Sequence, residues 1–248
     1  MDRLVYTAYS GLKGQMAAQT AIANNIANAS TTGFRAERVS FERMMLKGSP
    51  LESRQPGVEQ VIDADRRAGA VMQTGRVLDV AITGEDAWLA VQASDGQEAY
   101  TRRGDLSVAP SGVLQTGDGF PVIGQSGPIT VPPHDALSIA ADGTISIVPQ
   151  GGDPGQPQEL DRLKLASAKG SDTVKRLDNL LRVRGGGALP ADLSATVASG
   201  AIEGSNVNLT QALVDMIENQ RSYEVQANLM KEARTMDEGG ASLMRLPA

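Results

Sequence analysis

The sequence predicts an α+β fold in which terminal N- and C-helices form a split coiled-coil domain and an antiparallel all-β domain is inserted between them. Three observations predict this fold. Apolar residues recur at helical spacing near each end of the chain, at about residues 2–28 and 207–238. Between them, at 75–184, short β-branched or alternating segments are separated by Gly, Asp and Pro turn residues. The 248 residues are enough for one or two domains.

The first helix carries apolar residues at alternating steps of four and three, which is the spacing of a coiled-coil seam. This N-terminal seam consists of Val5, Tyr9, Leu12, Met16, Gln19, Ala23 and Ile26. The helix is expected to end at its asparagines and the following Ser30-Thr31-Thr32-Gly33, because Asn side chains compete for backbone hydrogen bonds. Gly33 is expected to take a left-handed conformation in the cap and turn. Such a break could also aim the connector at a neighbouring subunit.

The last helix repeats the pattern. Its C-terminal seam consists of Leu209, Leu213, Met216, Gln220, Tyr223, Ala227 and Met230. A stripe of two residues in seven covers a narrow face, so each helix must bury it against something else, and the other terminus is the nearest candidate. Gln19 and Gln220 interrupt the two seams, which either specifies register or reflects lax packing.

The segments between the helices differ in character. Residues 35–74 mix Arg, Glu, Met, Ser, Pro and Gly without periodicity, which predicts an extended connector. The all-β domain follows at 75–184, with a core of Ala, Val, Leu and Ile because only 3% of residues are aromatic. The triple glycine at 185–187 begins a second connector, 185–203. The split assembly domain is therefore predicted to comprise 1–34 and 204–248.

Composition excludes several functions. A net charge of −6 leaves no basic field for nucleic acid, and without cysteine there are no disulfides, thiolate metal sites or thiol nucleophiles. The single histidine, His134, has neither a second histidine for a metal site nor a nucleophile elbow, so we expect no cofactor, no metal, no catalytic residue and no small-molecule substrate. No apolar run of about 18 residues predicts membrane insertion, and no cleavable leader is recognisable at the N-terminus.

Two short motifs have competing interpretations. Arg103-Gly104-Asp105 matches a tripeptide that adhesion receptors bind, but it falls where a hairpin turn is needed. Asn28-Ala29-Ser30 and Asn208-Leu209-Thr210 are formal glycosylation sequons on the predicted assembly helices, where modification is not expected.

A set of ordered motifs resembles the family of flagellar basal-body rod and hook proteins. The first motif, at the end of the first helix, comprises Asn25, Ile26, Ala27, Asn28, Thr31, Gly33 and Phe34. The others follow in the order of that family, and they are Gly75-Arg76-x-Leu78-Asp79-Val80, Tyr100-Thr101-Arg102-x-Gly104-Asp105, Gly112 with Asp118-Gly119-x-Pro121-Val122, and Ile202-Glu203-Gly204-Ser205-Asn206-Val207. They span nearly the whole chain.

The resemblance implies a structural subunit, not an enzyme. Such a subunit is exported unfolded by the flagellar type III apparatus without a cleaved signal peptide, and it assembles axially with other rod subunits into the drive shaft that crosses the periplasm. Within the family, Met1 to Ala8 and Gly127 to Pro132 are most similar to a proximal rod subunit, with a distal rod or hook subunit as the alternative. An exported adhesin using the Arg-Gly-Asp turn is a more remote alternative.

Overall fold

The computed structural model describes residues 2–43, 57–84, 86–176 and 178–243. Helices α1 (Asp2–Ala27) and α2 (Leu209–Leu243) lie at the two ends of the chain, and the strands lie between them, which confirms the predicted α+β class. The chain divides into two compact units. The helical unit comprises residues 1–27, 37–63 and 208–248, and the β unit comprises 28–36 and 64–207.

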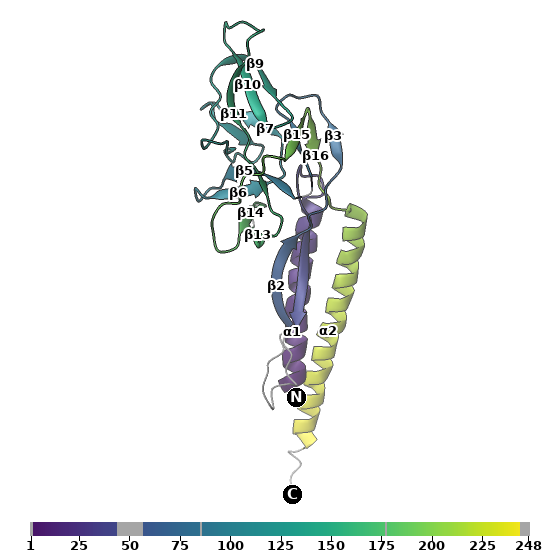
Figure 1. Cartoon of the computed structure of the whole chain (residues 1–248). Helices are drawn as coiled ribbons and strands as arrows, with labels where there is room; N and C mark the ends of the chain where they lie inside the picture. Colours follow the sequence, from purple (N-terminus) through teal and green to yellow (C-terminus); the bar gives the residue numbers. More distant parts are fainter. Residues whose placement is uncertain (1, 44–56, 85, 177, 244–248) are drawn as a thin grey trace. The chain divides into compact units, whose positions relative to one another are not determined.

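In the helical unit, α1 and α2 lie side by side and antiparallel (Figure 1). The Gln15 side chain donates to Ser222 Oγ at 3.0 Å, and Asn219 Nδ2 donates to the Gln15 carbonyl oxygen at 3.0 Å. One turn away, Gly11 lies against the side chain of Gln226, and a Cβ at Gly11 would be 2.9 Å from Gln226 Oε1. The helices therefore approach each other through small and polar residues.

The two predicted seams do not cover each other within the chain. Tyr9 and Met16 of the N-terminal seam are 62% and 57% exposed, and Leu209 and Leu213 of the C-terminal seam are exposed as well. At about 100° per residue, the N-terminal seam lies on the side of α1 opposite the buried residues Gly14 and Ala21. The split coiled coil is thus not formed by these seams in a single chain. An apolar pattern shows which face requires burial, but it does not identify the partner.

The remaining seam residues are either partly buried or exposed. Leu12, Ile26, Met216, Ala227 and Met230 are partly buried. Gln19, Ala23, Gln220 and Tyr223 are exposed. Val5 lies on α1, but its side chain is outside the described part of the structure.

The segment predicted as an extended connector, 35–74, contains strands. Strands β1 (Glu37–Arg43) and β2 (Gly57–Ala64) pair with each other, and the stretch 44–56 lies outside the described residues. Strand β3 (Val71–Gln73) pairs antiparallel with β16 (Ala201–Glu203). The second predicted connector, 185–203, likewise contains β15 (Thr196–Ser199) as well as β16. Because apolar and polar residues do not alternate throughout these segments, the sequence pattern predicts no strand there.

The described strand pairs of the β unit are antiparallel, as predicted. Its largest sheet has the order β12-β5-β6-β14-β13, a second has the order β11-β10-β9, and two-stranded sheets join β7 to β8 and β15 to β4. The bounds are β4 (Val80–Thr83), β5 (Ala87–Gln92), β6 (Glu98–Thr101), β7 (Leu106–Val108), β8 (Leu114–Thr116), β9 (His134–Ile139), β10 (Thr144–Pro149), β11 (Gln158–Arg162), β12 (Leu165–Ser167), β13 (Thr173–Lys175) and β14 (Leu181–Val183).

Two apolar clusters form the core of the β unit. The buried members of the larger cluster are all Ala, Val, Leu or Ile, as the low aromatic content predicts. The smaller cluster contains Trp88 and Tyr100 among alanines and leucines. Charged side chains are also buried in the β unit, and they define the site described next.

Candidate functional site

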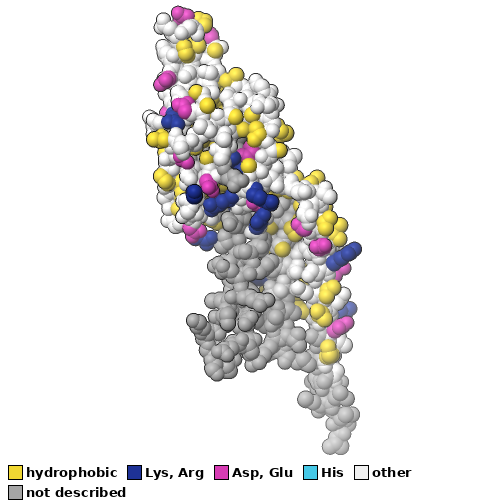
Figure 2. Space-filling model, turned by 45° about the vertical axis from the view of Figure 1, so that its right-hand side comes forward, with side chains coloured by type: hydrophobic (Ala, Val, Ile, Leu, Met, Phe, Trp, Pro, Cys, Tyr) yellow, Lys and Arg dark blue, Asp and Glu magenta, His cyan; other side chains and the backbone are white. Residues whose placement is uncertain are grey.

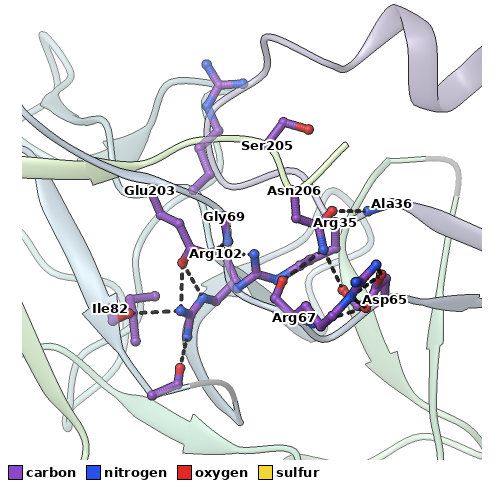
Figure 3. Close-up of polar contacts among 12 residues, drawn as sticks. Arg35, Ala36, Asp65, Arg67, Gly69, Ile82, Arg102, Glu203, Ser205 and Asn206 are labelled. Carbon is purple, nitrogen blue, oxygen red and sulfur yellow. Dashed lines mark hydrogen bonds and ion pairs between the residues drawn. The ribbon is translucent and has the colours of Figure 1, made fainter. Parts of the chain in front are cut away.

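Residues within or directly beside three sequence motifs converge on one buried carboxylate, that of Glu203. Arg35 follows the first motif, Arg102 directly follows β6, and Glu203 ends β16. Arg35 Nη1 lies 2.5 Å from Glu203 Oε1, and Arg102 Nη2 lies 2.6 Å from Glu203 Oε2 (Figure 3). Each of these side chains is at most 2% exposed. We call Arg35, Arg102 and Glu203 the ionic cluster.

Arg102 also binds backbone carbonyl groups around the turn between β4 and β5. Its Nη1 donates to the carbonyl oxygens of Gly84 and Ala87 at 2.6 and 2.5 Å, and its Nη2 donates to that of Ile82 at 2.9 Å. Glu203 Oε1 accepts a further hydrogen bond from the Gly69 N–H at 2.7 Å. A buried charge is costly unless it is paired and hydrogen-bonded, and these contacts meet that requirement for Arg102 and Glu203.

Gly33 brings the first motif against Arg102. Its N–H donates to the Glu203 carbonyl oxygen at 2.7 Å, and its φ is +67°, the left-handed conformation predicted from the sequence. A Cβ at this position would lie 2.3 Å from the Arg102 carbonyl carbon, so only glycine fits. Since α1 ends at Ala27, Gly33 serves a turn well beyond the helix rather than the helix cap itself.

Phe34 anchors the same segment in the β unit. It is buried, and Lys175 Nζ lies 3.6 Å from its ring centroid. Lys175 Nζ also donates to the Arg35 carbonyl oxygen at 2.9 Å. Residues 28–36 are therefore part of the β unit, whereas the sequence placed the boundary of the assembly domain after residue 34.

Asn206, from the last motif, binds the backbone of Ala36, the residue that follows Arg35. Its Oδ1 accepts the Ala36 N–H at 2.7 Å, and its Nδ2 donates to the carbonyl oxygens of Asp65 and Arg67 at 3.0 and 2.8 Å. The Asp65 N–H in turn donates to the Ala36 carbonyl oxygen at 2.7 Å. One side-chain amide thus joins two chain segments that leave the β unit at different points.

Asn25 makes an equivalent contact within the helical unit. Its Nδ2 donates to the Glu37 carbonyl oxygen at 2.9 Å and its Oδ1 accepts the Glu37 N–H at 2.7 Å, so it pairs with the first residue of β1 as a neighbouring strand would. Asn24 Nδ2 donates to Glu37 Oε1 at 2.6 Å. Asn28 instead closes the turn after α1, with its carbonyl oxygen 3.1 Å from the Thr31 nitrogen and its Oδ1 3.1 Å from Thr31 Oγ1. The motif asparagines thus have local roles at the end of α1 and the start of β1.

The described residues offer no arrangement that we can connect with catalysis. They contain no group of three or more His, Cys, Asp or Glu that could hold a metal ion. His134 Nδ1 lies 2.9 Å from the Pro132 carbonyl oxygen. Burial raises the pKa of the Tyr100 hydroxyl, which donates to Glu98 and accepts the Leu189 N–H inside the core. Among the described helices, none has the length and apolar character needed to cross a membrane.

The Arg-Gly-Asp turn is engaged internally. Arg103 Nε donates to Asp105 Oδ1 at 2.8 Å, so the two charged residues of the tripeptide pair with each other. Arg103 Nη1 also donates to Asp118 at 2.7 Å. Likewise, Asn208 Oδ1 accepts the Gln211 N–H at 3.1 Å and caps α2. These pairings give both motifs a structural role.

Sequence reasoning assigned no role to Arg35, Arg102 or Glu203. The available signal was that each is a charged residue within or directly beside a matched motif. Their burial could not be read from the sequence, because charged residues are mostly exposed and only the fold brings these three together.

Comparison with protein-family models gives three matches along the chain. A model described as "Flagella basal body rod protein" matches residues 5–35, a "Flagellar hook protein FlgE/F/G D1 domain" matches 81–147, and a "Flagellar basal body rod FlgEFG protein C-terminal" matches 198–243. Arg35 lies in the first matched region, Arg102 in the second and Glu203 in the third. The ionic cluster therefore joins all three.

Comparison with individual proteins gives similarity over nearly the full length. The chain is 41% identical to the flagellar basal-body rod protein FlgF of Salmonella typhimurium over 244 residues, covering 96% of this chain and 95% of that protein. It is 39% identical to FlgF of Escherichia coli over 252 residues, covering 99% and 98%. It is 32% identical to the rod protein FlgG of Bacillus subtilis over 253 residues, covering 93% and 94%. The FlgF proteins are thus the more similar of these relatives.

Proposed function

Since this chain belongs to the flagellar basal-body rod protein family and is a structural subunit of that rod, we propose that it occupies the proximal rod and joins its neighbours through the seams of α1 and α2. The higher identity to FlgF than to FlgG, over nearly complete chains, favours the FlgF type. Its partners are other rod and hook components. A distal rod or hook position is the alternative.

One observation carries the proposed mode of assembly. The N-terminal seam lies on the face of α1 opposite the buried Gly14 and Ala21, and Tyr9 and Met16 on that seam are more than half exposed. Leu209, Leu213 and Tyr223 of the C-terminal seam are exposed as well. Large apolar side chains in coiled-coil register gain stability when a partner helix covers them. In an assembling subunit, that partner is a helix of a neighbour.

The buried contacts of the β unit support this function in a second way. The ionic cluster fixes the segment after α1 to the strand that leads toward α2, since Arg35 and Glu203 belong to those two stretches. A subunit that transmits torque needs chain segments that do not yield. We propose that the cluster, together with Asn206, keeps these segments of the β unit in place under load.

We further propose that the subunit reaches the periplasmic part of the rod through the flagellar type III export apparatus. This part of the proposal rests on family membership. Unfolded export also fits a chain without cysteine, because no disulfide has to form before or after passage.

The seam proposal is tested by making Tyr9→Gln and Met16→Gln together in the otherwise unchanged chain. We expect export of the variant, incomplete rods in isolated basal bodies, and loss of swimming. Leu193→Gln is the matched control, because Leu193 is an exposed apolar residue of the β unit and should be replaceable without effect. Complete rods and normal swimming with the double variant would reject assembly through this seam.

A further inference from the structure

The charged residues of the β unit are segregated along the chain. Residues 162–184 contain seven basic and two acidic residues, which gives this stretch a formal net charge of +5. Residues 132–161 contain neither Lys nor Arg, and their formal net charge is −5 with the histidine neutral. The five acidic residues of this second stretch are Asp135, Asp142, Asp153, Glu159 and Asp161. Opposite charges of this kind guide association and select partners.

The acidic stretch forms β9, β10 and most of β11. Within the described part of the chain, none of its five carboxylates takes part in an ion pair. Residues 150–157 connect β10 to β11 and are exposed throughout, and we call them the Asp153 loop. The Gly151 N–H donates to Asp135 Oδ2 at 2.9 Å, and the Gly155 N–H donates to Asp153 Oδ1 at 2.9 Å. The loop therefore presents a carboxylate on a turn with internal hydrogen bonds.

The basic stretch lines a hollow beside β13 and β14. This hollow has a volume of about 370 Å³, and Arg176, Arg182 and Arg184 are among its lining residues. We call it the arginine hollow. Arg176 lies directly after β13 and is exposed, and no ion pair between described residues includes it.

Few carboxylates compete for the arginine hollow. Asp172 and Asp178 pair with Arg184 and Arg182, but neither aspartate lines the hollow. Glu98 does line it, and Lys164 Nζ lies 2.7 Å from the Glu98 carboxylate. The lining side chains thus carry three positive charges and one negative charge, and the hollow favours an anionic group.

The triple glycine 185–187 gives the arginine hollow a wall without side chains. The φ values of the three glycines are +90°, +88° and +102°. A Cβ at any of them would meet nothing within 4 Å, so packing inside the chain does not exclude side chains from this wall. Bare backbone of this kind allows the backbone of a partner to approach closely. A loop of another protein chain fits such a wall.

We propose that the arginine hollow receives the Asp153 loop of a second copy of this chain, so that the β units of successive copies join head to tail. The inference rests on the proposed function, because it assumes that copies of the chain meet in the rod. Strands β10 and β11 lie toward one end of the β unit and β13 and β14 toward the other, so the loop does not reach the hollow of its own chain (Figure 1). Figure 2 shows acidic side chains at the upper end of the β unit and basic side chains gathered farther down.

The contact is heterologous, since the Asp153 loop and the arginine hollow are different surfaces. A heterologous contact leaves one loop and one hollow free after each addition, so it continues from copy to copy. Complementary charge contributes more to the choice and register of the partner than to affinity. The contact therefore orients each added β unit relative to the previous one.

Exchange of the two charges tests the inference in cells. Asp153→Arg and Arg176→Glu each place like charges across the contact, so we expect each to give incomplete rods in isolated basal bodies and loss of swimming. The double variant restores opposite charges and should recover both. Asp142→Arg is the matched control, because Asp142 is an exposed acidic residue that, like Asp153, accepts the N–H two residues further on. This control should swim normally.

Cysteine cross-linking gives a second readout that does not depend on charge repulsion, because the native chain contains no cysteine. Cells co-express one copy with Asp153→Cys and one with Arg176→Cys, and basal bodies are isolated and oxidised. We expect a disulfide-linked dimer that disappears on reduction. The control pair, Asp142→Cys with Arg176→Cys, should give none.

The outcomes separate the inference from the proposed function. Complete rods with both single charge variants, or no dimer from the Asp153 and Arg176 pair in complete rods, would overturn the contact and leave the rod function intact. Impaired single variants without recovery in the double variant would overturn a second copy as the occupant of the hollow. Equal effects of Asp142→Arg and Asp153→Arg would overturn the Asp153 loop as the docking element. Absence of the native chain from isolated rods would overturn the proposed function, and the inference with it.

Discussion

Arg102 and Glu203 lie 101 positions apart in the chain and form an ion pair with two nitrogen–oxygen contacts in the β unit. Both side chains are 1% exposed. Arg102 Nη2 and Nε lie 2.6 and 2.8 Å from Glu203 Oε2. Arg35 contacts the other carboxylate oxygen, so one glutamate holds two arginines that come from different motifs. The ionic cluster therefore links the chain segments that carry three of the family motifs.

Glu203→Gln should strongly destabilise the β unit. The substitution keeps the size of the side chain but leaves Arg35 and Arg102 without their shared carboxylate. Breaking a buried ion pair from one side costs about 3–5 kcal/mol, and we expect a loss of this order in the free energy of unfolding measured with urea. Glu238→Gln is the control, because the Arg234–Glu238 pair on α2 is exposed and should contribute less than about 1 kcal/mol. Equal effects of the two variants would contradict a structural role for the cluster.

Gly33→Ala should destabilise more than Gly75→Ala. Both glycines have similar positive φ values, +67° and +73°, so the backbone cost of a Cβ, about 1–2 kcal/mol, is shared. At Gly75 the Cβ would meet nothing within 4 Å, whereas at Gly33 it would lie 2.3 Å from the Arg102 carbonyl carbon. Thermal unfolding of the two variants measures the difference. Similar melting temperatures would show that the segment at Gly33 shifts freely.

Asn25→Asp should weaken the start of β1. Aspartate can still accept the Glu37 N–H, but it cannot donate to the Glu37 carbonyl oxygen, and it places a carboxylate oxygen against that carbonyl group. We expect a loss of about 1–3 kcal/mol in local stability, measured by hydrogen exchange of the Glu37 N–H.

Asn208→Asp provides the contrast for that experiment. Asn208 caps α2 by accepting only, and aspartate serves equally well at such a position, so this variant should be nearly neutral. If both substitutions leave exchange unchanged, donation by the Asn25 amide is not important.

Lowering the pH should reduce the stability of the β unit, because Asp178 becomes protonated. Burial by itself would raise the pKa of Asp178, but hydrogen bonds from Arg182 and the Leu180 N–H outweigh burial and hold the pKa below its ordinary value. A carboxyl group whose pKa is lowered by folding contributes stability above its unfolded pKa, about 3.9, and loses it as the pH falls through the folded pKa.

Urea unfolding between about pH 5 and pH 2 measures this contribution. Asp178→Asn should flatten the acid limb of the pH profile in the native background. In an Arg182→Gln background the same substitution should have little further effect, because the two residues interact directly. If stability falls with pH in the same way in the native protein, the two single variants and the double variant, the Asp178–Arg182 pair does not contribute to the pH dependence of stability.

Much of the fold follows from local patterns. Helices predicted at about 2–28 and 207–238 are found at Asp2–Ala27 and Leu209–Leu243, and antiparallel strands fill the region predicted to be all-β. These elements are predictable because the apolar and turn residues that determine a helix, strand or turn lie only a few positions apart in the chain. Strands β1 and β2 were missed because periodicity is not sustained over residues 35–74, and the alternation of polar and apolar residues in β1 is limited to Arg38 to Glu42.

The candidate site was only partly predictable. The left-handed Gly33 and the helix end at the asparagines follow from backbone preferences of those residue types. The partners of Asn25 and Asn206 do not, because a side-chain amide can bind any backbone group that the fold brings within reach. The burial of Arg35, Arg102 and Glu203 is likewise a property of the packed chain.

By itself, the sequence determined the α+β class, the terminal helices, an aliphatic core and membership of a family of rod proteins, because periodicity, composition and motifs reside in neighbouring residues. Only the tertiary structure decided which helix faces pack together and which remain exposed. It also decided that one carboxylate holds arginines from two distant motifs. These are contacts between residues far apart in the chain, and their energies depend on burial and geometry that exist only after folding.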